Sequence, residues 1–188
     1  MLLVMDQSAL SALVPWANFY VIVGSSAGAL IGLQFVVITL VSQAQAIRSA
    51  REIRAFGSPT VVHFGAALVL SAIMRAPWST LFHVGLCLVT LGTAGFAYAI
   101  MVVRHARAQT GYAPDAEDWF WYVVLPLVGY AALIAEAVSL SQGFKWCLFL
   151  VAASSLLFLF IGIHNAWDTV TYVALRRVEN SEERKASN

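Results

Sequence analysis

The sequence predicts an all-α fold: a polytopic membrane helix bundle with five transmembrane helices, its N-terminus outside and its C-terminus in the cytoplasm (N-out/C-in). Three observations predict it. Of the 188 residues, 60% are hydrophobic and only 11% are charged, whereas about a quarter of the residues of a soluble domain are charged. Five apolar stretches follow one another, and a helix needs about 20 such residues to cross a bilayer. Lys and Arg are concentrated in alternate connecting segments, which fixes the direction of the spans.

The expected spans cover about 17–41, 59–78, 80–103, 119–140 and 144–164, and the last helix should continue to about 177. The second span is the weakest, because its uncharged part is short and Arg75 must extend to the membrane surface. Ser58 is placed to cap this helix and Pro59 to occupy its first turn. We treat 1–177 as a single transmembrane domain. The polar segment 178–188 should be a disordered cytoplasmic tail.

The basic residues give the orientation. Nine of the eleven Lys and Arg residues fall in the loop after the first span, the loop after the third span and the C-terminal tail. An odd number of spans places these three segments on one side, and positively charged segments remain in the cytoplasm. The loop at 42–56 should extend the first helix, and its Arg48, Arg51 and Arg54 could bind an anionic lipid or a partner protein.

Small residues mark faces on which helices approach closely in lipid. Gly24, Gly28 and Gly32 lie on one side of the first span, where we expect tight helix packing; a pore-lining or self-associating face is the alternative. Gln34 lies on a second face, so the first span should be the hub of the bundle. In the third span, the inward stripe is expected to hold His83, Cys87, Thr90, Ala94, Ala97, Tyr98 and Met101.

Two groups of ionisable residues are expected at different depths. Glu136 is costly to expose to lipid, and Arg75 lies at the same outer level, so the two should form an outer ion pair. This pair could be structural or could be an ion or proton site at an outer vestibule.

The second group is an inner polar cluster of five side chains: Gln34, His63, His164, Asn165 and Asp168. His164 and Asp168 are one helical turn apart and therefore lie on one face. An aspartate beside an imidazole could form a proton relay or a cation site. The alternative is a structural role, because polar residues near the membrane interface cost little.

We expect no cofactor and no metal. A haem would need two histidines at matched depth, and only His63 and His164 qualify. No metal-ligand spacing, nucleophile motif or phosphate-binding loop is present, so the chain is not expected to be an enzyme. No Lys/Arg run suggests nucleic acid as a partner.

The first span, "NFYVIVGSSAGALIGLQFVVITL", resembles a pattern in small uncharacterised bacterial multi-pass membrane proteins, in which a Gly/Ala-rich stretch precedes a segment like Gly32–Val36. "SPTVVHF" at 58–64 is similar to the start of their next helix. The resemblance implies a bacterial inner membrane and carries no established activity.

Two functions fit these features. The first is a homo-oligomeric protein forming a channel or small-solute/ion permeation pathway, with the stripe bearing Gln34, Asn165 and Asp168 along its wall. The second is a non-transporting regulatory or scaffold protein that packs against a partner. In both, the lipid bilayer is the main environment.

Overall fold

The protein is described here by a computed structural model covering residues 11–43, 50–107 and 116–186. All elements in these residues are helical, which confirms the all-α part of the predicted fold class. In order, they are the 3₁₀-helix η1 (Ser11–Trp16), α2 (Ala17–Gln43), α3 (Ala50–Arg75), α4 (Leu81–Arg107), α5 (Ala116–Trp119), the π-helix η2 (Phe120–Val124), α6 (Leu125–Ser141) and α7 (Cys147–Ala186).

Four helical segments in the described chain are long and apolar enough to cross a membrane: Ser11–Thr39, Leu81–His105, Phe120–Ser141 and Cys147–Thr171. The apolar part of α3, Pro59–Arg75, is shorter. Large apolar side chains cover the outside of the helices; Phe149 is 70% exposed and Trp167 is 71% exposed. Soluble monomers rarely expose apolar patches of this extent, so lipid is the surrounding that this surface fits.

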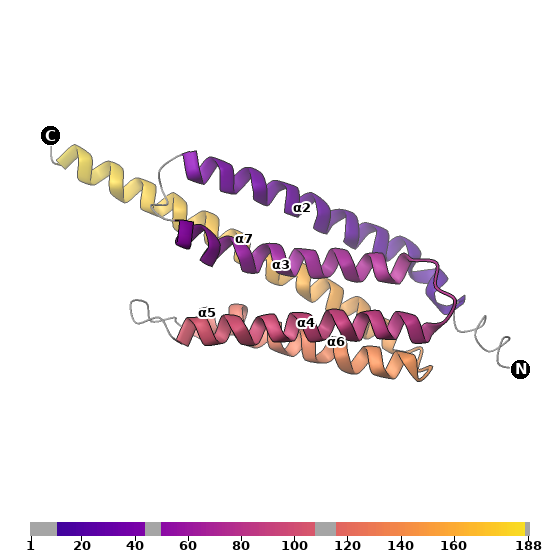
Figure 1. The fold of residues 1–188 in the computed structure, drawn as a ribbon. Helices are drawn as coiled ribbons and strands as arrows, with labels where there is room; N and C mark the ends of the chain where they lie inside the picture. The colour runs from indigo at the N-terminus through magenta and orange to yellow at the C-terminus, as the bar shows by residue number, and fades with distance from the viewer. Residues whose placement is uncertain (1–10, 44–49, 108–115, 187–188) are drawn as a thin grey trace, which may run out of the picture.

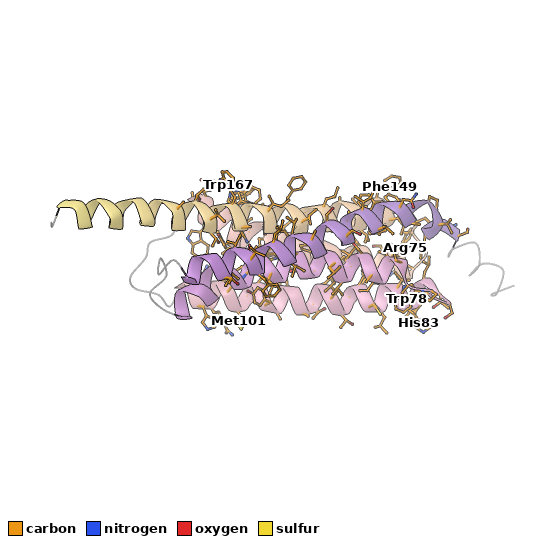
Figure 2. All side chains as sticks on the ribbon, turned by 90° about the horizontal axis from the view of Figure 1, so that it is seen from above. Arg75, Trp78, His83, Met101, Phe149 and Trp167 are labelled. Atoms are coloured by element: carbon orange, nitrogen blue, oxygen red, sulfur yellow. The ribbon has the colours of Figure 1, made fainter. Side chains whose placement is uncertain are left out.

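The long helices lie side by side and alternate in direction (Figure 1). At one end, which we call the Arg75 end, lie Arg75, Trp78 and His83 (Figure 2). At the opposite end, the Arg107 end, α4 stops and α7 projects beyond the other helices (Figure 1). There the guanidinium of Arg107 lies 5.7 Å from the centre of the Trp119 ring, a cation–π contact that joins α4 to α5.

The central helices of the bundle are α3 and α7 and not the first span, since α3 contacts α2, α4 and α7. α7 contacts α2, α3 and α6, whereas α2 packs mainly on α3 and α4 mainly on α6. In its most apolar stretch, 50% of the residues of α7 are buried, against 22% in the stretch containing α2. The prediction failed because polar and small residues identify a non-lipid face without identifying how many helices cover it.

The glycines of α2 explain part of this difference. A methyl group at Gly24 would lie 3.0 Å from Cβ of Ser71, so α3 approaches α2 closely there. Gly28 and Gly32 are exposed, and no atom of the described residues lies within 4 Å of a methyl group built on either. Of these three glycines of α2, only Gly24 therefore takes part in close packing against another described helix.

The closest approach involving glycines is instead between α4 and α6. A methyl group at Gly85 would lie 2.9 Å from the carbonyl oxygen of Ala137, and one at Gly92 would lie 2.8 Å from Ile134. The inward stripe expected in the third span is wrong, because none of its residues is buried. The exposed ones are His83, Thr90, Ala94, Ala97 and Met101, and the half-buried ones are Cys87 and Tyr98. The glycines, with leucine and valine between them, form the true inward face of α4 because they admit α6.

Several helix boundaries differ from those expected. α2 is described to Gln43, 44–49 of its predicted extension lie outside the described residues, and 50–56 belong to α3. Arg51 and Arg54 belong to the start of α3, and Arg48 lies outside the described residues. Ser58 and Pro59 lie within α3 and do not begin it.

At the other end of the chain, α7 continues to Ala186, so 178–186 is helical and not a disordered tail. This segment contains no Gly or Pro and is rich in Glu, Lys, Arg and Ala. These residues have high helix propensity, so they allow a helix that is already formed in the membrane to continue.

Pro126 explains the π-helix that precedes it. Proline has no N–H and its ring clashes with the carbonyl one turn before it, here that of Tyr122. The chain responds with wider turns: the N–H of Leu125 donates to the carbonyl of Phe120, five residues back. The chain therefore accommodates Pro126 with a π-helix.

Candidate functional site

The polar interior of the bundle lies along the faces that α3, α6 and α7 turn toward one another. Its members come from those helices and from η2: Glu136, Ser154, His63, Tyr130, Asn165, Asp168 and Tyr122. We call this set the polar seam. Ser154 and Asn165 lie on the same side of α7, separated along its axis by about 16 Å at 1.5 Å per residue.

At the Arg75 end of the seam, Glu136 of α6 is bound by Ser154 of α7. The Ser154 hydroxyl lies 3.0 Å from one carboxylate oxygen and 3.1 Å from the other. Glu136 is 7% exposed and Ser154 is 5% exposed. The expected outer ion pair does not form: Arg75 is exposed and does not contact Glu136. The reason is that the end of α3 lets Arg75 extend to the surface, whereas Glu136 turns inward to α7.

A second polar pair joins α3 to α6. Nδ1 of His63 and the hydroxyl of Tyr130 are 3.1 Å apart, and both side chains are buried. Tyr130 also stacks on Phe158 of α7 with ring centres 4.5 Å apart. Gly95 of α4 makes room for the Tyr130 ring, because a methyl group there would overlap it. His63 of the predicted inner polar cluster is thus held by a tyrosine that the sequence pattern did not single out.

The π-helix η2 supplies the contacts at the Arg107 end. Tyr122 donates a hydrogen bond of 2.8 Å to Oδ2 of Asp168. The neighbouring Trp121 stacks on His164, with ring centres 4.0 Å apart and planes 8° from parallel. Nε2 of His164 lies 3.6 Å from a carboxylate oxygen of Glu117. His164 and Asp168 therefore lie on one face of α7, as expected, but each is held by a different residue from η2 or α5.

Two further members of the predicted cluster are buried amides. Asn165 is 0% exposed and Gln34 is 3% exposed. Neither amide atom of Asn165 has a hydrogen-bond partner among the described residues, and Nε2 of Gln34 has none either. Buried polar side chains are nearly always bonded, so these amides are the least satisfied part of the interior.

Contacts between the helices place both amides at one level. Gly24 of α2 faces Ser71 of α3. Because the two helices are antiparallel, ten residues forward along α2 and ten residues back along α3 reach the same level, which sets Gln34 level with Val61. Gly162 of α7 faces Phe64 of α3, which sets Asn165 level with the same Val61. The predicted cluster residues thus lie toward the Arg107 end, but no hydrogen bond or ion pair of the described residues joins any two of them.

An apolar layer that packs around the His63–Tyr130 pair separates the two ends of the seam. Leu133, Phe158 and Ile161 are all 0% exposed, and they lie between the level of Ser154 and the level of Asn165. A hydrated ion does not pass through a layer packed in this way. A hollow of about 180 Å³ lies away from the seam, at the Arg75 end. It is lined by Leu13, Val14, Met74, Arg75, Ala76, Pro77 and Trp78.

No protein-family model, curated protein or solved structure matches this chain. The side chains of the described residues are therefore the basis for a functional assignment. Among them, no group of three or more His, Cys, Asp or Glu residues could hold a metal ion.

The sequence pattern missed Tyr130, Trp121 and the bonding role of Tyr122. A tyrosine in the middle of an apolar helix does carry a signal, because its buried hydroxyl needs a partner. His63 could not be matched to Tyr130 without knowing that α3 lies beside α6.

Proposed function

We propose that the protein conducts protons or a small cation along the polar seam, and that the packed apolar layer is the closed gate of this pathway. One observation carries the proposal: three polar pairs, the buried Glu136–Ser154 and His63–Tyr130 and the half-buried Asp168–Tyr122, follow one another along the interior. Ionisable residues inside a membrane protein are costly and are typical of ion pathways and proton relays.

The proposal differs in one respect from the pathway expected from the sequence. Gln34 and Asn165 are buried within a single chain, so they cannot line a pathway shared between subunits. The pathway proposed here runs inside each bundle. It requires rearrangement of Phe158 or Leu133 before water can connect the two ends.

Flux into liposomes tests the proposal. The purified chain is reconstituted into liposomes that contain a pH-sensitive dye. A potassium gradient with valinomycin drives proton entry, and the flux of a panel of cations is measured in the same liposomes. Glu136→Gln should lower proton flux, because the amide cannot exchange a proton. Glu117→Gln is the matched control, since Glu117 is 72% exposed. Flux no greater than that of protein-free liposomes would exclude the proposal.

A second function is favoured by one observation on α2. Gly28 and Gly32 are exposed, and no described residue lies within 4 Å of a methyl group built on either. Such a face suits close approach by another helix, as in a homo-oligomer or a scaffold that packs on a partner. Replacing both glycines by leucine should then dissociate the complex on size-exclusion chromatography with light scattering. Phe35→Leu, also exposed on α2, should leave the complex intact.

The remaining assignments belong to the same proposal. The resemblance of the first span favours a bacterial inner membrane, and the basic residues favour a cytoplasmic Arg107 end. Arg48, Arg51 and Arg54 would then lie where anionic lipid or a protein partner could bind them. A cysteine placed at Ser187 should react with impermeant reagents only from the cytoplasmic side.

A further inference from the structure

We propose that the interior of the Arg107 end holds one or more ordered water molecules, bound by Asn165 and Gln34. The proposal does not depend on whether anything crosses the membrane. It starts from three buried amide atoms without a partner among the described residues: Oδ1 and Nδ2 of Asn165 and Nε2 of Gln34.

The burial of these atoms makes their lack of partners informative. Asn165 is 0% exposed, so the surrounding membrane or bulk solvent cannot bond to it. Its neighbour Thr169 does not solve the problem, because the Thr169 hydroxyl donates to the backbone carbonyl of Asn165 and not to its amide. A native interior with a donor and an acceptor both unpaired is unfavourable, and buried water is the usual remedy.

The unpaired atoms comprise one acceptor and two donors, and this combination determines which ligand fits. A cation would satisfy Oδ1 of Asn165 but not the N–H groups of Asn165 and Gln34. An anion would satisfy the N–H groups but not the oxygen. Water both donates and accepts hydrogen bonds, so it is the small ligand that fits all three atoms.

The position of the amides also fits water. Both are level with Val61 of α3, on helices that pack together. One turn farther toward the Arg107 end, Asp168 is half-buried and bonded to Tyr122. These two polar side chains connect the buried amides with the surface. One turn the other way, Ile161 is 0% exposed and belongs to the apolar layer, so the water should stop there.

Cysteine reactivity tests the proposal. The full chain, with Cys87 and Cys147 replaced by alanine, carries either Asn165→Cys or the matched Ile161→Cys, and reacts with methyl methanethiosulfonate in detergent. Since only the hydrated thiolate reacts rapidly, Asn165→Cys should react at least about tenfold faster than Ile161→Cys. Equal, slow reaction at both positions would overturn the proposal. Gln34→Cys should behave like Asn165→Cys.

Thermal unfolding of Asn165→Leu provides a second measurement that needs no cysteine variant. If water bonds the amides, this substitution displaces it and leaves Gln34 unpaired, so the melting temperature should fall. If the site is dry, leucine removes two unpaired polar atoms and the melting temperature should rise. A rise would contradict the water site while leaving the flux measurement on Glu136→Gln unaffected.

Discussion

Tyr122 donates a 2.8 Å hydrogen bond to Oδ2 of Asp168 and so connects the π-helix η2 to α7. This bond depends on Pro126, which forces the wider turns of η2 and thereby sets the direction of both Trp121 and Tyr122. Two adjacent residues consequently contact two residues of α7 that are one turn apart, His164 and Asp168. A local backbone feature thus organises the Arg107 end of the seam.

Tyr122→Phe should destabilise the folded chain. It removes the donor to a half-buried carboxylate, and a hydrogen bond to a charged group contributes about 1.5–3 kcal/mol. Denaturant unfolding in detergent measures the loss. Tyr98→Phe is the control, because the Tyr98 hydroxyl bonds to no described residue. Equal stability of the two variants would show that the Tyr122–Asp168 bond contributes nothing to folding.

Ser154→Ala and Arg75→Gln distinguish a hydrogen-bonded Glu136 from an ion-paired one. Ser154 supplies the hydrogen bonds that Glu136 receives from the described residues, so its loss leaves a buried carboxyl group unpaired, at a cost of about 1–3 kcal/mol. Arg75 is exposed, and its replacement should change the free energy of unfolding by no more than about 0.5 kcal/mol. A larger loss of unfolding free energy for Arg75→Gln than for Ser154→Ala would instead support the Arg75–Glu136 ion pair expected from the sequence.

Gly85→Ala and Gly28→Ala test which glycines carry close packing. At Gly85 the new methyl group would meet the backbone of α6, which cannot move aside easily, so we expect a loss of about 1–3 kcal/mol. At Gly28 it would meet nothing within 4 Å, and alanine should stabilise the monomer by up to about 1 kcal/mol. Both are measured by unfolding of the monomer in detergent. A destabilised Gly28→Ala monomer would mean that α2 packs differently.

The sequence was sufficient for the helical class and for the approximate location of the spans, because long apolar stretches and their limits are properties of single helices. It also placed His63, His164, Asn165 and Asp168 at one end of the bundle, since depth follows from counting residues along each helix. These features need no knowledge of neighbours.

The features that the sequence did not predict all depend on which helices are adjacent. Glycine patterns occur in both α2 and α4, but only the α4 pattern meets a second helix through several glycines. Arg75 and Glu136 lie at the same depth but do not face each other. Depth can be counted from the sequence, whereas the rotation of each helix about its own axis cannot. His63 required Tyr130, a residue that only the proximity of α3 to α6 brings near.

Phe158→Ala should increase flux if the apolar layer is the gate. Phe158 is 0% exposed and its ring stacks on Tyr130, so truncation leaves a cavity between the polar pairs at either end of the seam. Water can enter a cavity that joins two polar regions, and hydrophobic gates open when they become hydrated. We therefore expect proton flux into liposomes to rise on the order of tenfold over the unmodified chain. Phe160→Ala is the matched control, because Phe160 is on the same helix but 60% exposed to lipid, and it should leave flux unchanged. Size-exclusion chromatography establishes that both variants remain folded. If the unmodified chain conducts protons and folded Phe158→Ala conducts no faster, the conduction pathway does not cross this layer.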